Sequence, residues 1–199
     1  GVGTTSNNIG FESAVGIFFD GAFQSRPGVA LGEFVDVEQV EVLRGPQGTR
    51  YGANALAGLV KIKMRDAAPD AGAHAEVTAG DHDTWSAGLA AGGAIGADGS
   101  AWRLAAQQFA SDGFQRNVLL NRDDTNGRDE ATLRGKLRWE VAPGWRADLA
   151  ALYVDLDNGF DAFAPDNSRR TRSDRPGRDA QRPRGVSANV AGAVGGGTT

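Results

Sequence analysis

A strict two-residue alternation of apolar and polar side chains is the feature that most restricts how this chain can fold. From Ala131 to Val141 every second position is apolar or glycine, and the positions between them carry Thr, Arg, Lys, Arg and Glu. The segment from Trp145 to Tyr153 resumes the pattern after a short turn. Successive side chains of a β-strand point to opposite faces of a sheet, whereas a helix repeats every 3.6 residues. The pattern therefore predicts an antiparallel hairpin with one apolar and one polar face.

Similar patterns upstream extend this hairpin into a larger sheet. Strands are expected at residues 73–79, 84–95, 101–110, 131–141 and 145–153. Tight turns at 96–100 and 142–144 alternate with long loops at 111–130 and from about residue 156. An 11-residue strand such as 131–141, tilted by about 40°, covers a height of roughly 27 Å, close to the apolar band of an outer-membrane barrel. We therefore expect residues 71–199 to form the N-terminal part of a transmembrane β-barrel, incomplete because barrels need at least about eight strands.

A soluble β-rich binding or adhesion domain is the alternative interpretation. Its strands would show the same alternation, because a half-buried strand looks alike whether lipid or protein covers its apolar face. Strand length and the unequal connections favour the membrane. Trp102, Trp139 and Trp145 follow or flank the tight turns, and we interpret them as part of an aromatic girdle at one membrane boundary.

Composition excludes several other functions. A net charge of −4, with basic residues clustered only between 169 and 184, argues against nucleic-acid binding; that cluster is expected to be a solvated loop or to touch anionic lipid headgroups. The chain has no cysteine, and its two histidines, His74 and His82, lack the spacing of a zinc pair. No catalytic residue, metal site or cofactor is therefore predicted, and we do not expect an enzyme.

Residues 1–70 follow a different pattern, in which short apolar runs alternate with glycine-rich turns. Strands are expected at 14–19, 37–43 and 59–64, with about two turns of helix between 49 and 56. This predicts a small α+β domain, separated from residues 71–199 by a linker of small residues at 67–72. From about residue 183 the sequence is of low complexity and lacks clear alternation, so a tail without further strands is expected.

The first region also carries a motif, EVLRGPQGTRYGANALAG, from Glu41 to Gly58. Arg44 ends a strand, and the following Gly-Pro-Gln-Gly forces a turn that holds its guanidinium on a rigid corner. The run closely resembles the plug signature of TonB-dependent receptors, and residues 17–28 and 59–64 resemble the plug segments on either side of it. The resemblance is carried chiefly by Glu41, Gly45, Pro46, Gly48, Tyr51, Gly52 and Gly58.

The resemblance implies a receptor in the outer membrane of a Gram-negative bacterium that transports a scarce ligand, most often a ferric siderophore. It implies TonB as the partner for energy coupling, through a segment N-terminal to the plug, and it implies that the chain is a fragment of a longer receptor. It further implies that Arg44 pairs with carboxylates of the barrel wall and locks the plug in place. The residues alone are equally consistent with Arg44 as an exposed cap of the domain surface. The ligand-binding residues are not predicted.

Overall fold

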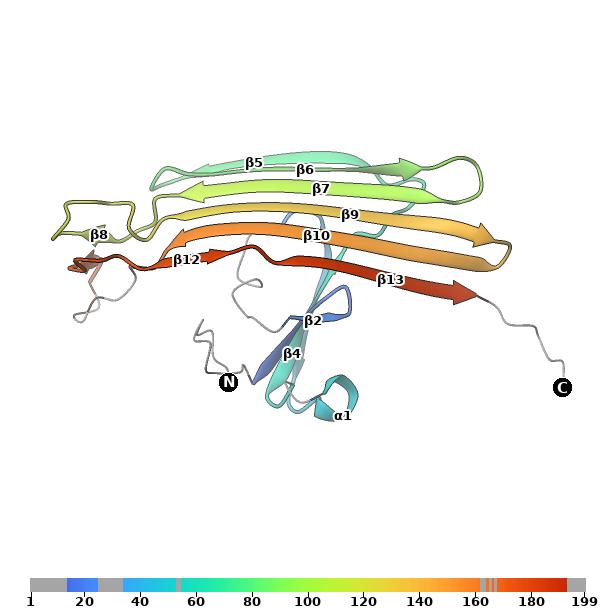
Figure 1. The fold of residues 1–199 in the computed structure, drawn as a ribbon, viewed down its shortest axis with the longest axis horizontal. Helices are drawn as coiled ribbons and strands as arrows, with labels where there is room; N and C mark the ends of the chain where they lie inside the picture. Colours follow the sequence, from blue (N-terminus) through green and yellow to red (C-terminus); the bar gives the residue numbers. More distant parts are fainter. Residues whose placement is uncertain are drawn as a thin grey trace. The chain divides into compact units, whose positions relative to one another are not determined.

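The chain folds into two compact units, with the boundary between Arg65 and Asp66. The computed structural model describes residues 14–24, 34–52, 55–161, 164, 166 and 168–192. Each unit is built around its own β-sheet (Figure 1). Within the described ranges, no helix is long and apolar enough to cross a membrane. The assignment of residues 1–70 and 71–199 as functional domains stays a prediction.

The first unit is a four-stranded sheet with the order β2-β1-β4-β3. β1 pairs in parallel with β4, and β3 and β2 pair antiparallel with their neighbours. Asp20 and Gly21, with φ of 46° and 83°, form the two-residue turn between β1 and β2, because such turns require positive φ at both positions. The elements of this unit are β1 (Val15–Phe19), β2 (Ala22–Gln24), β3 (Val37–Arg44), α1 (Gly48–Tyr51) and β4 (Gly58–Met64).

Small apolar clusters hold this sheet together. Leu59 is fully buried with Phe18 and Ala55 in one cluster, and Ile62 and Met64 are buried with Phe19 in another. The strands expected at 14–19, 37–43 and 59–64 are confirmed to within a residue. The expectation of two helical turns is wrong.

The helix α1 ends at Tyr51 after one turn. The next residue, Gly52, has a φ of 91°, and a residue in this conformation cannot continue a right-handed helix.

The second unit is a seven-stranded antiparallel sheet with the order β12-β10-β9-β7-β6-β5, in which β13 also pairs with β10. All of the strands expected between residues 73 and 153 are present. A separate two-residue ribbon joins the two long loops, because β8 pairs in parallel with β11. The elements are β5 (Gly72–Gly80), β6 (Thr84–Ala94), β7 (Ala101–Ser111), β8 (Arg116–Asn117), β9 (Arg128–Ala142), β10 (Trp145–Gly159), β11 (Arg170–Thr171), β12 (Arg178–Gln181) and β13 (Arg184–Gly192).

The expectation of a tail without strands from about residue 183 is also wrong. β13 pairs with β10 over its whole length, from Arg184 opposite Tyr153 to Gly192 opposite Trp145. β12 pairs with the C-terminal residues of the same strand, 156–159. The break between β12 and β13 falls at Pro183, which has no amide proton to donate to a sheet. The two short strands therefore form one interrupted edge of the sheet.

Candidate functional site

The second sheet distributes its side chains in the opposite way from a soluble protein. Along β7, Arg103 and Gln107 are 4% and 7% exposed, whereas Leu104 between them is 53% exposed. The apolar face is thus the open one. Other large apolar side chains on this face are also exposed: Leu89, Leu133, Trp139, Leu149 and Val186. An extended exposed apolar face on a regular sheet marks a surface that another apolar phase or partner covers.

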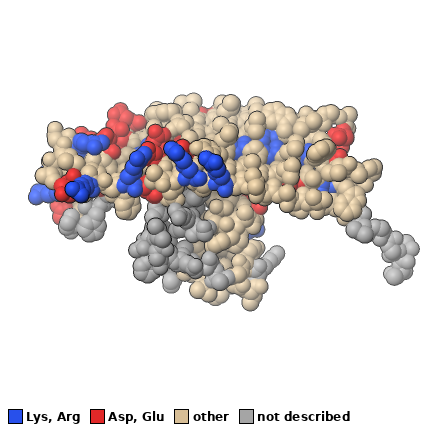
Figure 2. Space-filling view, viewed as in Figure 1, with Lys and Arg blue, Asp and Glu red and all other residues tan. Residues whose placement is uncertain are grey.

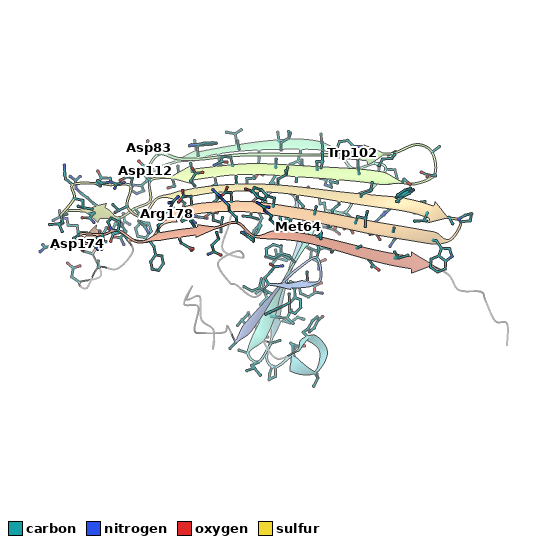
Figure 3. The ribbon with its side chains drawn as sticks, in the orientation of Figure 1. Met64, Asp83, Trp102, Asp112, Asp174 and Arg178 are labelled. Carbon is teal, nitrogen blue, oxygen red and sulfur yellow. The ribbon has the colours of Figure 1, made fainter. Side chains whose placement is uncertain are left out.

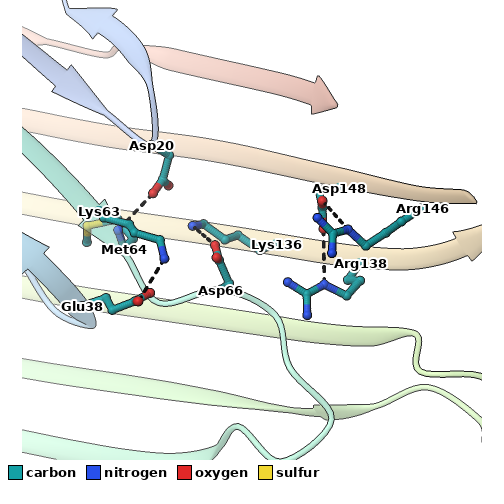
Figure 4. Close-up of polar contacts among 9 residues, drawn as sticks. All are labelled: Asp20, Glu38, Lys63, Met64, Asp66, Lys136, Arg138, Arg146 and Asp148. Carbon is teal, nitrogen blue, oxygen red and sulfur yellow. Dashed lines mark hydrogen bonds and ion pairs between the residues drawn. The ribbon is translucent and has the colours of Figure 1, made fainter. Parts of the chain in front are cut away.

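The opposite face of the same sheet carries cations held by hydrogen bonds and ion pairs. The ammonium of Lys136 lies 3.0 Å from the carboxylate of Asp66. Asp148 accepts from both Arg138, at 3.4 Å, and Arg146, at 2.9 Å (Figure 4). The Arg103 guanidinium donates to the carbonyl of Ala71. One face of the sheet is therefore suited to an apolar environment, and the other to a polar one.

The predicted girdle residues lie on the apolar face. Trp139 and Trp145 flank the β9–β10 turn and are 55% and 41% exposed. Trp102 is opposite Leu137, which is in turn opposite Leu149, so Trp102 lies farther along the sheet from that turn (Figure 3). At the other end of the same face are Tyr153 and Trp85, the latter next to the β5–β6 turn at residues 81–83, and neither was predicted as a girdle residue. A membrane role for these aromatic residues stays a prediction.

The two long loops are tied together by a buried polar network. Asn117 is fully buried, and its amide donates to the Asp161 carboxylate and to the Ser173 carbonyl, both at 2.8 Å. The Thr171 hydroxyl donates to the same carboxylate at 2.7 Å. Burial alone would raise the pKa of Asp161, but the hydrogen bonds from Thr171 and Asn117 outweigh it and the pKa is lowered. The network gives the loop end of the sheet a fixed structure, which the sequence did not reveal.

Acidic side chains line a hollow of about 660 Å³ beside this network, among them Asp83, Asp112 and Asp124. Figure 3 labels Asp83 and Asp112. Burial, together with the charges of Asp83 and Asp124, raises the pKa of Asp112. No group of three or more potential ligands with metal-binding geometry occurs among the described residues. The hollow therefore has no assigned ligand.

In the first unit, the plug-like motif forms the corner between β3 and β4. Gly45, with a φ of 84°, donates its amide to the Ala57 carbonyl, and Gln47 donates to Ala55. The amides of this turn hold the segment before β4 close to the end of β3. At Gly58 an added Cβ would lie 2.5 Å from the Leu43 carbonyl oxygen, so only glycine fits there.

The other motif side chains brace the corner. Glu41 pairs with Lys61 at 2.8 Å, and the Tyr51 ring packs on Phe18 at 5.4 Å between centroids. Pro46, Gly48 and Gly52 shape the chain around α1. The Arg44 side chain is exposed at this corner and has no carboxylate partner among the described residues. The geometry accounts for the motif glycines, whereas the lock role of Arg44 stays a prediction.

Comparisons with known proteins agree with this architecture. Residues 1–59 match the TonB-dependent Receptor Plug Domain family. The vitamin B12 transporter BtuB of Vibrio vulnificus is 30% identical over 121 residues, which are 61% of this chain and 20% of that protein. The BtuB of Photobacterium profundum is 26% identical over 126 residues, 63% of this chain and 20% of that protein. The chain thus spans about a fifth of the length of these curated relatives.

Solved structures share the fold. The ferric yersiniabactin uptake receptor FyuA of Yersinia pestis superposes with a TM-score of 0.72 at 23% identity, over 90% of this chain and 29% of that one. The ferripyoverdine receptor of the outer membrane of Pseudomonas aeruginosa gives a TM-score of 0.66 at 22% identity, over 91% and 26% of the two chains. Residues 1–59 are therefore similar to the plug domain of TonB-dependent receptors, and the chain shares its fold with solved outer-membrane receptors.

Proposed function

We propose that this chain supplies the plug and the first barrel strands of a receptor that imports a scarce ligand across the outer membrane, with energy from TonB. The observation that carries the proposal is the exposed apolar face of a sheet whose other face is polar, in the same chain as a plug domain. Lipid would cover the first face, and a wet, plugged lumen would adjoin the second.

The ligand class follows from the relatives. The similar solved proteins are an uptake receptor for ferric yersiniabactin and a receptor bound to ferripyoverdine, and the similar curated proteins transport vitamin B12. A ferric siderophore is our first candidate, and a cobalamin is the second. The protein acts as a receptor and transporter and has no catalytic role.

A soluble β-rich adhesion domain is not favoured. In such a domain Leu133, Trp139 and Leu149 would pack against another layer of protein, but they are 53%, 55% and 39% exposed. An open apolar face of this kind would aggregate in water. The same exposure is what a lipid-facing strand requires.

An uptake experiment tests the proposal. The intact receptor that contains this chain is expressed in a strain that lacks its own siderophore and cobalamin receptors, and uptake of radiolabelled ferric siderophores and cobalamin is measured. We expect outer-membrane fractionation, and uptake of one ligand class that stops when a protonophore removes the energy source. Recovery of the protein in the soluble periplasmic fraction would refute the proposal.

The role of Arg44 is tested in the same strain. We propose that its guanidinium pairs with carboxylates of the barrel wall, since it stands exposed on a rigid corner with no carboxylate partner among the described residues. Arg44→Gln should change the rate of ligand uptake. Arg44→Lys keeps the charge but not the two-pronged geometry, so it should bring the rate part of the way back to that of the unsubstituted receptor. Unchanged uptake in both variants would assign Arg44 to the domain surface only.

A further inference from the structure

Arginines line the loop end of the apolar face. Arg184 begins β13 opposite Tyr153, and its guanidinium lies 5.5 Å from the centre of that ring. Arg182 pairs with Asp155 at 3.1 Å, and Arg178 pairs with Asp157. Tyr153, Asp155 and Asp157 alternate along β10 on the same face as Leu149, so these arginines lie on the apolar side of the sheet.

These guanidinium groups are accessible and carry surplus positive charge. The Arg182 and Arg178 side chains are 71% and 69% exposed, and exposed ion pairs of this kind contribute little stability. Arg184 is exposed and has no carboxylate partner among the residues that the structure describes. Figure 3 labels Arg178 beside β12, and Figure 2 shows cationic side chains side by side along this part of the sheet. Asp155 and Asp157 hold two of the guanidinium groups in place, but two carboxylates do not neutralise the charge of all three arginines.

An apolar groove of about 710 Å³ opens directly below them on the same face. Small residues, Gly135, Ala151 and Ala188, form its floor, and larger side chains, among them Leu104, Leu149 and Val186, rise around it. The groove crosses β7, β9, β10 and β13 between two cross-strand rows of residues.

The groove and the arginines are continuous. Val186 lines the groove, and Arg184 lies two residues farther along the same strand and points to the same face, about 7 Å away. Arg182 and Arg178 continue in the direction of the loops. An amphiphile with an anionic head and an acyl chain would place its head at the arginines and its chain in the groove.

We propose that this surface, defined by Arg178, Arg182, Arg184 and the groove below them, binds one outer-leaflet lipid with a phosphorylated headgroup. The inference rests on the proposed function, which places lipid against the apolar face and the long loops outside the cell. Guanidinium groups bind phosphate through paired hydrogen bonds. The arginines hold the phosphates, and an acyl chain fills the groove across Gly135 and Ala151.

Lipid binding to the intact, detergent-purified receptor tests the proposal. Native mass spectrometry follows titration with diphosphoryl lipid A, and with the same lipid after removal of its phosphates. The triple variant Arg178→Gln, Arg182→Gln and Arg184→Gln should weaken binding of the phosphorylated lipid roughly 100-fold, at about fivefold for each arginine. The variant Ala151→Leu, which fills the groove, should weaken it roughly tenfold through lost apolar contact.

Matched controls separate this site from general charge and size effects. Substitution of Arg169, Arg172 and Arg175 by Gln removes the same charge from the neighbouring loop, and Ala73→Leu adds the same bulk elsewhere on the apolar face. Both should leave binding within about twofold. Equal weakening by the control triple, equal binding of the dephosphorylated lipid, or complete displacement by inorganic phosphate would overturn the proposal.

Failure of the proposed function would look different. A receptor that fractionates in the outer membrane and takes up its ligand, yet binds lipid A without regard to these arginines, refutes only the lipid site. A protein that never enters the outer membrane refutes the proposed function itself.

Discussion

Replacement of Leu149 by arginine tests the claim that lipid covers the apolar face of the second sheet. Leu149 is 39% exposed, midway along β10 between Trp145 and Tyr153. That stretch advances roughly 27 Å along the strand, or roughly 21 Å in height at a tilt of about 40°. Leu149 therefore lies near the middle of the proposed apolar band.

The expected cost depends on this depth. An arginine on the lipid face costs about 2–4 kcal/mol at the bilayer midplane and about 0–1 kcal/mol near the interface. Leu149→Arg should thus lower the free energy of unfolding by about 2–4 kcal/mol, measured by urea titration of the intact receptor in phospholipid vesicles. In water the same substitution at a partly exposed position would be nearly neutral, within about 0.5 kcal/mol.

A matched substitution on the polar face of the same sheet shows how much of the cost comes from placing the arginine on the apolar face. Ser187 is on β13 opposite Ala150, one residue from the level of Leu149 but on the polar face. Ser187→Arg should cost less than about 1 kcal/mol, because water or polar groups solvate the new charge. Equal costs for the two variants, or a neutral Leu149→Arg, would refute the assignment of lipid to the apolar face.

Other predictions concern the loops and the sheet edges. Asn117→Ala should cost about 2–4 kcal/mol, since it removes two buried donors and leaves the Asp161 carboxylate under-bonded; faster amide exchange at β8 and β11, with β9 unchanged, would verify it. Because the pKa of Asp161 is lowered in the folded state, its contribution to stability is present above the ordinary value of 3.8 and is lost as pH falls below about 4. Asp161→Asn should remove that pH dependence of loop exchange, and an unchanged profile would contradict this. Residues 1–199 alone should aggregate and transport nothing, because β5 and the β12–β13 edge have no further strand partner among the described residues; a compact monomer in sedimentation analysis would disprove it.

The long strands of the second unit could be predicted because their alternation is strong. β7, β9 and β10 contain the predicted strands, β6 ends one residue before its predicted end, and the turns at 96–100 and 142–144 lie where glycine and proline occur. β9 and β10 are each 15 residues long, because pairing continues beyond the apolar band through polar residues such as Glu130 and Asn158, which share a hydrogen bond. Polar strand ends do not show hydrophobic alternation, so the sequence understated their length.

The elements that were missed depend on contacts distant in sequence or on weak hydrophobicity. β13 does alternate, with Val186, Ala188 and Val190 on one face, but Ala and Gly make the contrast small. The β8–β11 ribbon pairs Arg116 with Arg170 and Asn117 with Thr171 across more than fifty residues. No local pattern announces such a pair, so the loop network became visible only in three dimensions, whereas the basic cluster at 169–184 was apparent from the sequence without its place on the sheet.

The cations on the polar face constrain what lies against it. Arg103, Lys136 and Arg138 project from neighbouring strands at nearly the same level of the sheet. In a dry protein core each would need full pairing, because an uncompensated buried charge costs several kcal/mol. The Asp148 carboxylate is instead shared between Arg138 and Arg146. Sharing of this kind is inexpensive only where water or further polar groups complete the solvation, which supports the proposal that the polar face adjoins a wet lumen and that the apolar face is the outer one.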